Sequence, residues 1–593
     1  MADAAAPAFL GVERSLTGRR WRSRVADDRL AQALSQRLGL PELVGRVLAA
    51  RGVSLDDAEL YMAPTLKALL PDPSRFLDMD RAAGRLVQAV TAGERIAIFG
   101  DYDVDGATSS ALLIRFFRHI GIEPRLYIPD RMVEGYGPNI PAMRRLAGEG
   151  VRLVITVDCG TLAFQPLAAA REAGLDVLVA DHHLAEPELP DAFALVNPNR
   201  LDEVVGHRQL AAVGVTFLLI VAANRALRAA GWYGPGRSEP DLMAWLDLVA
   251  LGTICDVVPL TGLNRALVAQ GLKVMAQRRN PGIAALADIA GLSEKPGCYH
   301  CGFLLGPRVN AGGRVGRADL GARLLSTDDA AEAASLAAEL DRHNRERQAI
   351  EAQVLEQALA QVADGIEGAV AVVAGEGWHP GVVGIVAARV REATNRPSLV
   401  IAVDENGVAK GSGRSVPGID LGTAVVAALQ AGILVNGGGH AMAAGVTLHA
   451  SRIGELKEFL DARLATPVAA LGDVRSLGLD GAVSVDGANA QLLELLDRAG
   501  PYGSGNAEPR LVLPQARVVD ASIVGEKHVR VVLSGMGGGR LKGIAFRALD
   551  NELGKFLLGP GRDGLHVAGH LRADNWRGER RVQLVIEDAA PLR

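Results

Sequence analysis

Cysteine is scarce in this chain of 593 residues, which contains only four. So small a number provides no disulfide framework and fits a reducing compartment. Cys298, His300 and Cys301 have the spacing of half a zinc site, but no second cysteine pair completes a tetrahedral set. We therefore expect small buried thiols, with a structural zinc site as the weaker alternative.

Long apolar runs are also missing. No uninterrupted stretch approaches the roughly 18 apolar residues that a membrane span requires. The segment from Met1 to Ala6 lacks the basic region and apolar core of a secretory signal. These absences predict a cytoplasmic protein without a membrane partner.

Aromatic residues make up only 4% of the chain, and its net charge is -5. Both values argue against nucleic-acid binding by extensive base stacking or by a generally basic surface. The charge is unevenly distributed, because residues 509–593 hold 14 lysines and arginines against nine acidic residues. This local surplus is compatible with a nucleic-acid surface at the C-terminal end.

The chain has 49% hydrophobic and 22% charged residues, so it can bury several cores, and its length predicts roughly three or four domains. Helical patterns alternate with short apolar strands at 95–99, 153–157 and 177–180, which predicts a parallel, doubly wound α/β sheet. A stretch without proline or glycine at 328–362 predicts a connecting helix of roughly 50 Å. A second, smaller α/β unit is expected after it.

Short alternating strands with glycine-rich turns follow residue 506, as at 529–533 and 581–586. This pattern predicts a small β-barrel of the oligonucleotide-binding (OB) type. Its candidate side chains for single-strand binding are Phe546, Arg547, Trp576, Arg577 and Arg581, although both aromatic residues are equally compatible with the barrel core. The expected division is an N-terminal helical segment at 1–75, the first α/β unit at 76–327, the helix at 328–362, the second unit at 363–470, and a linker with the barrel at 471–593.

Acidic and histidine side chains recur where apolar runs end. They form the motifs Asp101-Tyr-Asp103-Val-Asp105-Gly, Thr-Val-Asp158-Cys-Gly, Asp181-His182-His183 and Cys-Asp256. Because ligands of doubly wound sheets gather at the carboxyl ends of the strands, we expect these side chains to meet in one place. The first motif alone is also typical of a solvated turn or a calcium loop, but an EF-hand loop needs glutamate at its twelfth position, which is Leu112 here.

Several aspartates in one dry pocket would repel one another, so cations must offset their charge. Carboxylate oxygens with imidazole nitrogen suit Mn²⁺ or Mg²⁺. Two such ions about 3.5–4 Å apart can activate a water, polarise a phosphoryl oxygen and stabilise the leaving oxygen. The motifs therefore predict phosphodiester hydrolysis at a site for two Mn²⁺ or Mg²⁺ ions.

Glycine-rich segments in the second α/β unit include Gly-Ser412-Gly-Arg414 and the run Gly437, Gly438, Gly439 and His440. Glycine beside serine, arginine and histidine allows the backbone to approach phosphates closely. A lone triple glycine is more typical of a flexible turn, but its pairing with Ser412 and Arg414 favours substrate binding.

The order of these motifs resembles that of the RecJ family of single-strand-specific exonucleases, in the DHH phosphoesterase superfamily. The resemblance runs from about Leu70 to Arg593. It rests on the segments 100–106, 251–260, 306–314 and 437–440 and on the closing Asn-Trp-Arg-Gly at 575–578. The resemblance implies a DHH catalytic domain, a smaller DHHA1-type domain and a C-terminal OB-type barrel.

The resemblance also implies residue roles. Metal ligands would be Asp103, Asp105, Asp158, His182 and Asp256, with Asp158 bridging two ions, and His183 would act on the scissile phosphate. Substrate phosphates, including a terminal 5′ phosphate, would be gripped by Arg131, Arg308, Ser412 and Arg414, with Asn310 and Arg314 as supports or further contacts.

Three positions depart from the family pattern. Phe99 occupies a position that is a metal-binding histidine in some related phosphoesterases, so one ion is expected to lean on Asp101. Gly312 replaces an alanine of the usual Asn-Ala-Ala-Gly-Arg segment, and Leu263 stands where relatives often have glutamate. None of these changes removes an expected ligand or phosphate-binding arginine.

The implied reaction is processive removal of 5′ mononucleotides from single-stranded DNA, in the 5′-to-3′ direction, during recombination and repair. Single-strand-binding protein and a RecQ-type helicase are the implied partners, and a monomer is expected. One alternative is a nanoRNase or cyclic-dinucleotide phosphodiesterase of the same superfamily, against which the barrel argues. Another is a non-catalytic repair scaffold, which would be free to lose the ligands that this chain retains.

Overall fold

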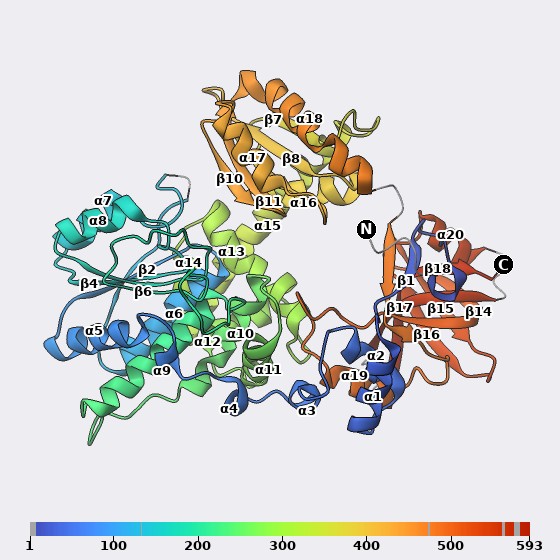
Figure 1. Ribbon diagram of the computed structural model, residues 1–593, viewed down its shortest axis with the longest axis horizontal. Coiled ribbons are helices and arrows are strands. Elements are labelled where there is room, and N and C mark those ends of the chain that lie inside the picture. The colour runs from blue at the N-terminus through green and yellow to red at the C-terminus, as the bar shows by residue number, and fades with distance from the viewer. Residues whose placement is uncertain (1–6, 132, 472–474, 560–563, 575–580, 593) are drawn as a thin grey trace.

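The structure is a computed structural model that describes residues 7–131, 133–471, 475–559, 564–574 and 581–592. Figure 1 shows the first α/β unit at the left, the second unit above it and the barrel at the right. The long helix α15 leads from the first unit to the second.

The first unit is built on a sheet of five parallel strands in the order β3-β2-β4-β5-β6. These are β3 (Arg125–Tyr127), β2 (Ile96–Gly100), β4 (Leu153–Val157), β5 (Asp176–Ala180) and β6 (Ala194–Val196). Alternate side chains of each strand enter separate apolar cores, as Ile98 and Phe99 do. Both faces of the sheet are therefore covered, as the apolar strands predicted.

One face packs on α5 (Met79–Ala92), α6 (Val104–His119) and α9 (Ala212–Ala229), and the other on α7 (Ile140–Gly148) and α8 (Phe164–Glu172). Helix α9 is long and apolar enough to cross a membrane, yet 72% of its residues are buried within the fold. It is the central core helix of this unit. The helices that follow are α10 (Leu246–Cys255), α11 (Gly262–Met275), α12 (Pro281–Ile289), the π-helical turn η4 (His300–Leu305), α13 (Gly306–Val315) and α14 (Leu320–Ser326).

Helix α15 (Ala330–Ala360) confirms the long helix predicted at 328–362. Asp329 caps its start by accepting hydrogen bonds from the backbone amides of Ala331 and Glu332. The helix packs against α12, α13 and α14 near its start and against α16 (Val383–Thr394) near its end. It therefore joins the two α/β units through contacts with both.

The second unit has a mixed sheet in the order β10-β11-β9-β8-β7, in which only the β7–β8 pair is parallel. Its strands are β7 (Ala371–Glu376), β8 (Ser398–Val403), β9 (Val408–Arg414), β10 (Asn436–His440) and β11 (Ala443–His449). Helices α17 (Leu421–Gln430) and α18 (Ile453–Leu471) complete it. The glycine-rich β10 is one of the two edge strands of this sheet.

The C-terminal part is a closed barrel. Strand β14 pairs with both β15 and β17, while β16 and β18 complete the ring. The bounds are β13 (Gly481–Ala482), β14 (Leu511–Val524), β15 (His528–Ser534), β16 (Arg540–Ala545), α20 (Glu552–Leu558), β17 (Leu565–Asp574) and β18 (Arg581–Pro591). Closure removes free sheet edges and confirms the expected barrel.

The N-terminal segment packs on this barrel. Strand β1 (Arg20–Ser23) pairs with β12 (Ser476–Leu479), and the buried Trp21 donates a hydrogen bond to Asp588. Helices α1 (Asp28–Leu38), α2 (Glu42–Ala49) and α3 (Ala58–Met62) share an apolar core with α19 (Ala490–Arg498) and the barrel strands, and α4 (Leu66–Leu69) leads on to the first unit. The segment predicted as helical therefore also contains a strand, and the division of the chain at the expected boundaries remains a prediction.

Candidate metal centre

Three of the four acidic motifs follow neighbouring parallel strands. Asp101 follows β2, Asp158 follows β4 and Asp181 follows β5, so all three lie at the same edge of the sheet. Asp256 comes from outside the sheet, directly after α10. The arrangement gathers the predicted ligands at the carboxyl ends of the strands.

Two further aspartates of the first acidic motif, Asp103 and Asp105, are fixed by hydrogen bonds from backbone amides. Asp103 caps α6 by accepting from the amides of Asp105 and Gly106 at 2.9 and 3.1 Å. Asp105 is buried and accepts from Ala212 and Val213 at the start of α9, at 2.7 and 2.9 Å. A Cβ at Gly106 would lie 2.4 Å from the Asp101 carbonyl oxygen, so this close turn requires glycine.

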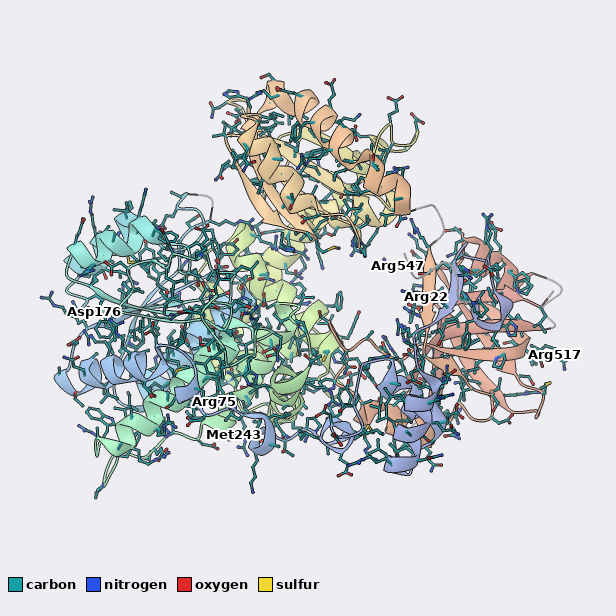
Figure 2. The ribbon with its side chains drawn as sticks, in the orientation of Figure 1. Arg22, Arg75, Asp176, Met243, Arg517 and Arg547 are labelled. Atoms are coloured by element: carbon teal, nitrogen blue, oxygen red, sulfur yellow. The ribbon has the colours of Figure 1, made fainter. Side chains whose placement is uncertain are left out.

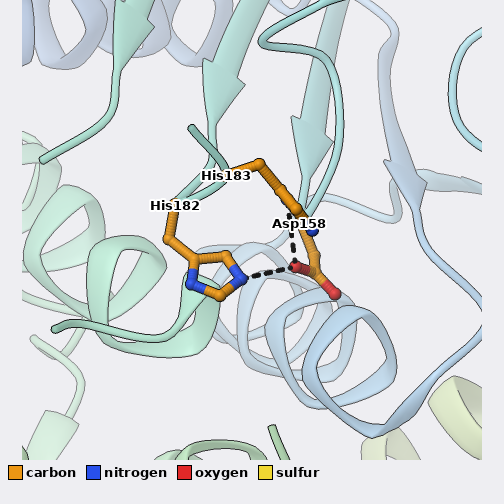
Figure 3. Close-up of side chains that lie close together, drawn as sticks. All are labelled: Asp158, His182 and His183. Carbon is orange, nitrogen blue, oxygen red and sulfur yellow. Dashed lines mark ion pairs between the residues drawn. The ribbon is translucent and has the colours of Figure 1, made fainter. Parts of the chain in front are cut away.

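His182 lies at the middle of the group. Its Nε2 atom is 3.3 Å from Asp158 Oδ1, 3.5 Å from Asp256 Oδ2 and 3.9 Å from Asp105 Oδ2. Figure 3 shows His182 and His183 from one loop facing Asp158. Three sets of three side chains each bring a donor atom within 4.8 Å of one another: Asp158, His182 and His183; Asp105, His182 and Asp256; and Asp101, Asp103 and Asp158.

The donor atoms fit bound cations. Asp158 Oδ1, His182 Nε2 and Asp256 Oδ2 are buried and have no hydrogen-bond partner among the described residues. Buried polar atoms are normally paired, because leaving them without a partner costs free energy. Three such atoms that face one another, with carboxylate and imidazole chemistry, fit Mn²⁺ or Mg²⁺.

The pKa values show the same need for positive charge. Burial and the neighbouring Asp103 raise the pKa of Asp105 to about 7, and burial with the charges of Asp105 and Asp103 raises that of Asp256 to about 9. The pKa values of Asp158 and Asp101 are also raised, mainly by burial and then by adjacent carboxylates. Cations would restore the ionised forms of these side chains.

The two histidines, His182 and His183, differ in the direction of their pKa shifts. Burial and the charge of His183 lower the pKa of His182 to about 4, so its imidazole is neutral and suited to bind a metal. Burial opposes the charge on His183, but its 2.7 Å hydrogen bond from Nδ1 to Asp181 raises its pKa to about 9. The hydrogen bond to Asp181 thus favours the protonated form of His183.

Sequence reasoning gave no role to Asp181 or Tyr136. Asp181 is buried and also accepts hydrogen bonds from the backbone amides of Thr161 and His182, which hold its carboxylate in place. The Tyr136 hydroxyl donates to the Asp158 carbonyl oxygen at 3.0 Å and lies 3.5 Å from His183 Nε2. The position of Asp181 at the head of the Asp-His-His motif was a usable signal, whereas nothing in the sequence marked Tyr136.

Three predicted phosphate-binding arginines interact electrostatically across the two α/β units. Burial and the charge of Arg131 lower the pKa of Arg314 to about 10, while burial, Arg391 and Arg131 lower that of Arg414. Arg314 donates to the Gly381 carbonyl oxygen at 2.7 Å, and Arg414 donates to Ser412 Oγ at 3.0 Å. Among residues that the structure describes, Arg131, Arg314 and Arg414 form no ion pair with a carboxylate, so their charge is available to an anion.

The other predicted substrate residues lie on α13 and on β10. Arg308 is ion-paired with Asp341 of α15 at 2.9 Å, and Asn310 accepts from the Val104 amide at 3.1 Å, beside the first acidic motif. Strand β10 contains Gly437, Gly438, Gly439 and His440. It lies two strands away from β9, which contains Ser412 and Arg414. At about 4.8 Å per strand, His440 lies about 10 Å from Arg414 in the same cross-strand row.

The remaining expectations concern zinc and the barrel. Cys298, His300 and Cys301 belong to no metal-binding group within the described ranges, and His300 instead contacts Glu294 at 3.1 Å. Phe546 is exposed and packs edge-on against His528. Arg547 follows it, Arg581 begins β18, and Trp576, Arg577 and the rest of the 575–578 motif lie outside the described residues.

Family models match three parts of the chain. Residues 95–253 match the DHH family N-terminal domain, 365–466 the DHHA1 domain and 479–588 the RecJ OB domain. The single-stranded-DNA-specific exonuclease RecJ of Salmonella typhimurium is 37% identical over 574 residues, which are 93% of this chain and 96% of that protein. This chain belongs to the RecJ family. The RecJ protein of Bacillus subtilis is 33% identical over 96% of this chain and 71% of its own length.

Solved RecJ structures share this fold. The crystal structure of RecJ from Thermus thermophilus in complex with Mn²⁺ matches with a TM-score of 0.79 and 31% identity, covering 97% of this chain and 80% of that one. A second crystal structure of the same protein, with Mg²⁺, matches with a TM-score of 0.74. The expected family, the two α/β domains and the OB-type barrel are thus confirmed.

Proposed function

We propose that this protein is a metal-dependent exonuclease that hydrolyses single-stranded DNA to 5′ mononucleotides. The observation that carries the proposal is the set of three buried donor atoms without hydrogen-bond partners, Asp158 Oδ1, His182 Nε2 and Asp256 Oδ2, in a chain of the RecJ family. Its RecJ relatives are named as single-stranded-DNA-specific exonucleases, and the solved ones bind Mn²⁺ or Mg²⁺.

The two ions would be held by Asp103, Asp105, Asp158, His182 and Asp256, with Asp158 between them and Asp101 close to one. Bound there, they would supply the activated water and the charge stabilisation of a phosphodiester hydrolysis. Asp105 and Asp103 are positioned by helix starts, which fixes their carboxylates before substrate arrives. Asp158 belongs to two of the three donor groups, which supports the bridging role.

His183 would act on the scissile phosphate as a proton donor. Its Nδ1 is bound to Asp181, so the proton on Nε2 remains to be donated to a phosphoryl or leaving oxygen. Its hydrogen bond to Asp181 raises its pKa and so favours the protonated ring that this role needs. Tyr136 beside Nε2 is placed to orient that proton.

Arg131, Arg314, Ser412 and Arg414 would bind the terminal 5′ phosphate of the strand. Arg308, Asn310 and the strand Gly437–His440 would bind further phosphates or support these contacts. A charged anchor at one end of the strand, at a fixed distance from the metal centre, would give the 5′-to-3′ direction and release one nucleotide per step.

The barrel supports a polymeric substrate over a dinucleotide, because a short substrate needs no additional binding domain. The non-catalytic scaffold is disfavoured by the retained ligands. We further propose a cytoplasmic monomer that acts with single-strand-binding protein and a RecQ-type helicase in recombination and repair.

The decisive experiment follows the products from a 5′-labelled single strand with Mn²⁺, run beside the matching duplex, a labelled RNA dinucleotide and the Asp103→Ala protein. We expect immediate release of labelled mononucleotide from the single strand alone, and none from the Asp103→Ala protein. A ladder of shortened labelled strands would overturn the direction, and cleavage of the dinucleotide alone would assign the chain to the small-substrate class.

A further inference from the structure

Two exposed aromatic rings lie stacked on the surface, on the segment that leads into α13. Tyr299 and Phe303 are 56% and 69% exposed, and their ring centroids are 5.2 Å apart with an interplanar angle of 25°. Phe303 lies on the π-helical turn η4, and Tyr299 directly precedes it. Exposing two large rings together costs free energy in water unless another molecule covers them.

The pair is attached firmly to the metal centre. Cys255, the neighbour of Asp256, donates from Sγ to the Cys301 carbonyl oxygen at 3.3 Å, and a Cβ at Gly306 would lie 2.5 Å from the same Sγ. Helix α13 continues from η4 and contains Arg308, Asn310 and Arg314. The rings and the predicted phosphate contacts therefore lie along one continuous helical segment.

Tyr299 of this pair also lies near the barrel. The carboxylate of Glu508 is the main group that raises the pKa of Arg572 on β17, and the Tyr299 phenol adds to this shift. Arg572 thus lies near Tyr299, although the two residues belong to different domains. The segment that bears the rings is thus joined to the residue before Asp256 and lies near strand β17 of the barrel.

Exposed aromatic residues are rare in the part of the chain that the structure describes. Among the large hydrophobic side chains that are exposed in the described ranges, four are aromatic: Tyr136, Tyr299, Phe303 and Phe546. Tyr136 touches the metal centre and Phe546 lies on the barrel. The other two lie on the segment that Cys301 joins to Cys255, beside Asp256, and that lies near Arg572 of the barrel.

We propose that Tyr299 and Phe303 form a stacking platform for bases of a single strand that extends from the barrel to the metal centre. The proposal rests on the exonuclease function above and adds a binding site to it. Bases stack on aromatic rings whatever their identity, and paired bases in a duplex cannot present their faces in this way. The platform would therefore favour unpaired strands without selecting a sequence.

The test measures binding of the full-length chain, without metal, to a 5′-phosphorylated single strand by fluorescence anisotropy. A set of strands carries one abasic site, moved stepwise along the sequence. The variants are Tyr299→Ala/Phe303→Ala, the ring-preserving Tyr299→Phe/Phe303→Tyr, and Val204→Ala as a control that removes an exposed apolar side chain elsewhere. Both rings are exposed, so their removal leaves the cores unchanged.

We expect the double alanine variant to bind the intact strand roughly 10-fold more weakly, within the range for loss of base stacking. For the unchanged protein, an abasic site at one or two adjacent positions should weaken binding similarly. In the double alanine variant those positions should no longer matter, whereas the ring-preserving and Val204→Ala proteins should behave as the unchanged protein does.

The platform would be overturned if the double alanine variant bound with unchanged affinity or stayed sensitive to the same abasic positions. The exposed rings would then be assigned to contact with a protein partner. Hydrolysis of the strand by the unchanged protein with Mn²⁺ is measured in parallel. If the unchanged protein does not hydrolyse the strand, the exonuclease function itself is contradicted. The failure of the platform and the failure of the exonuclease function are therefore distinguishable.

Discussion

Two regions of this protein that contain buried carboxyl oxygens, the barrel region and the metal centre, surround them differently. In the barrel region, Asp480 is fully buried, pairs with Arg24 at 2.9 Å and with Arg51, and accepts from the Arg510 amide at 2.8 Å. At the metal centre, Asp158 and Asp256 each have a buried oxygen without a hydrogen-bond partner among the described residues.

The difference separates a structural acid from a functional one. Where the chain supplies its own cations and donors, a buried carboxylate holds distant segments together, as Asp480 holds Arg51, just after α2, to Arg510, just before β14. Where the chain gathers carboxylates without enough positive charge, it depends on ions from solution. The four predictions below test this contrast.

The largest effect is expected from Asp158→Asn, which removes a charge and keeps the shape. Hydrolysis should fall by about 1,000-fold or more, because several kcal/mol of charge stabilisation by the ions would be lost. The metal-free protein should be at least as stable as before, since a buried charge among like charges is removed. Initial rates with Mn²⁺ and calorimetry without metal measure the two effects, and retained activity with a lower unfolding temperature would reverse our assignment.

The second prediction makes the matching change in the barrel region. Asp480→Ala should lower the free energy of unfolding by about 3–5 kcal/mol, because Arg24 and Arg51 lose their shared carboxylate. The specific activity of the folded protein at low temperature should remain unchanged on very short strands. Denaturant titration and rate measurements on the same preparation test this, and a normal midpoint with reduced catalysis would contradict the contrast.

The third prediction concerns metal addition. Mn²⁺ at about 100 times its dissociation constant should stabilise the native protein by about 2.7 kcal/mol, since the ion binds the folded centre. Asp480→Ala should show the same gain, whereas Asp158→Asn and Asp256→Asn should lose most of it. Thermal unfolding with and without Mn²⁺ gives the comparison, and an equal gain in all four proteins would place the ions elsewhere.

Much of this site could be predicted because it is encoded locally. Each of the strands β2, β4 and β5 is an apolar run that ends directly before an acidic motif. The order of run and motif therefore indicated that the acidic side chains lie at the carboxyl edge of the sheet. The segment 153–157 coincides with β4, and the absence of proline and glycine indicated α15.

The rest depended on contacts between segments far apart in the sequence. The pairing of β1 with β12 joins residues more than 450 positions apart, and no local pattern marks such a parallel pair. The ion pair that engages Arg308 comes from Asp341 on α15, and the contact between Arg314 and Gly381 crosses between units. Motifs thus identified the chemistry, while the partners of individual arginines required the fold.

The smallest effect is expected at Glu587 of β18, a paired acid of the barrel. Burial disfavours its charge, but hydrogen bonds from His570 and Arg510 prevail and lower its pKa to about 2. A carboxyl whose pKa is lower in the folded than in the unfolded state contributes stability above about pH 4.5, and this contribution is lost as the pH falls toward 2. Glu587→Gln should therefore lower the unfolding temperature modestly at pH 7 and reduce its decline between pH 4.5 and 2. Calorimetry over that range checks the sign, and a variant that loses stability on acidification as steeply as the unchanged protein would show that this acid, unlike Asp480, is not held by its arginine.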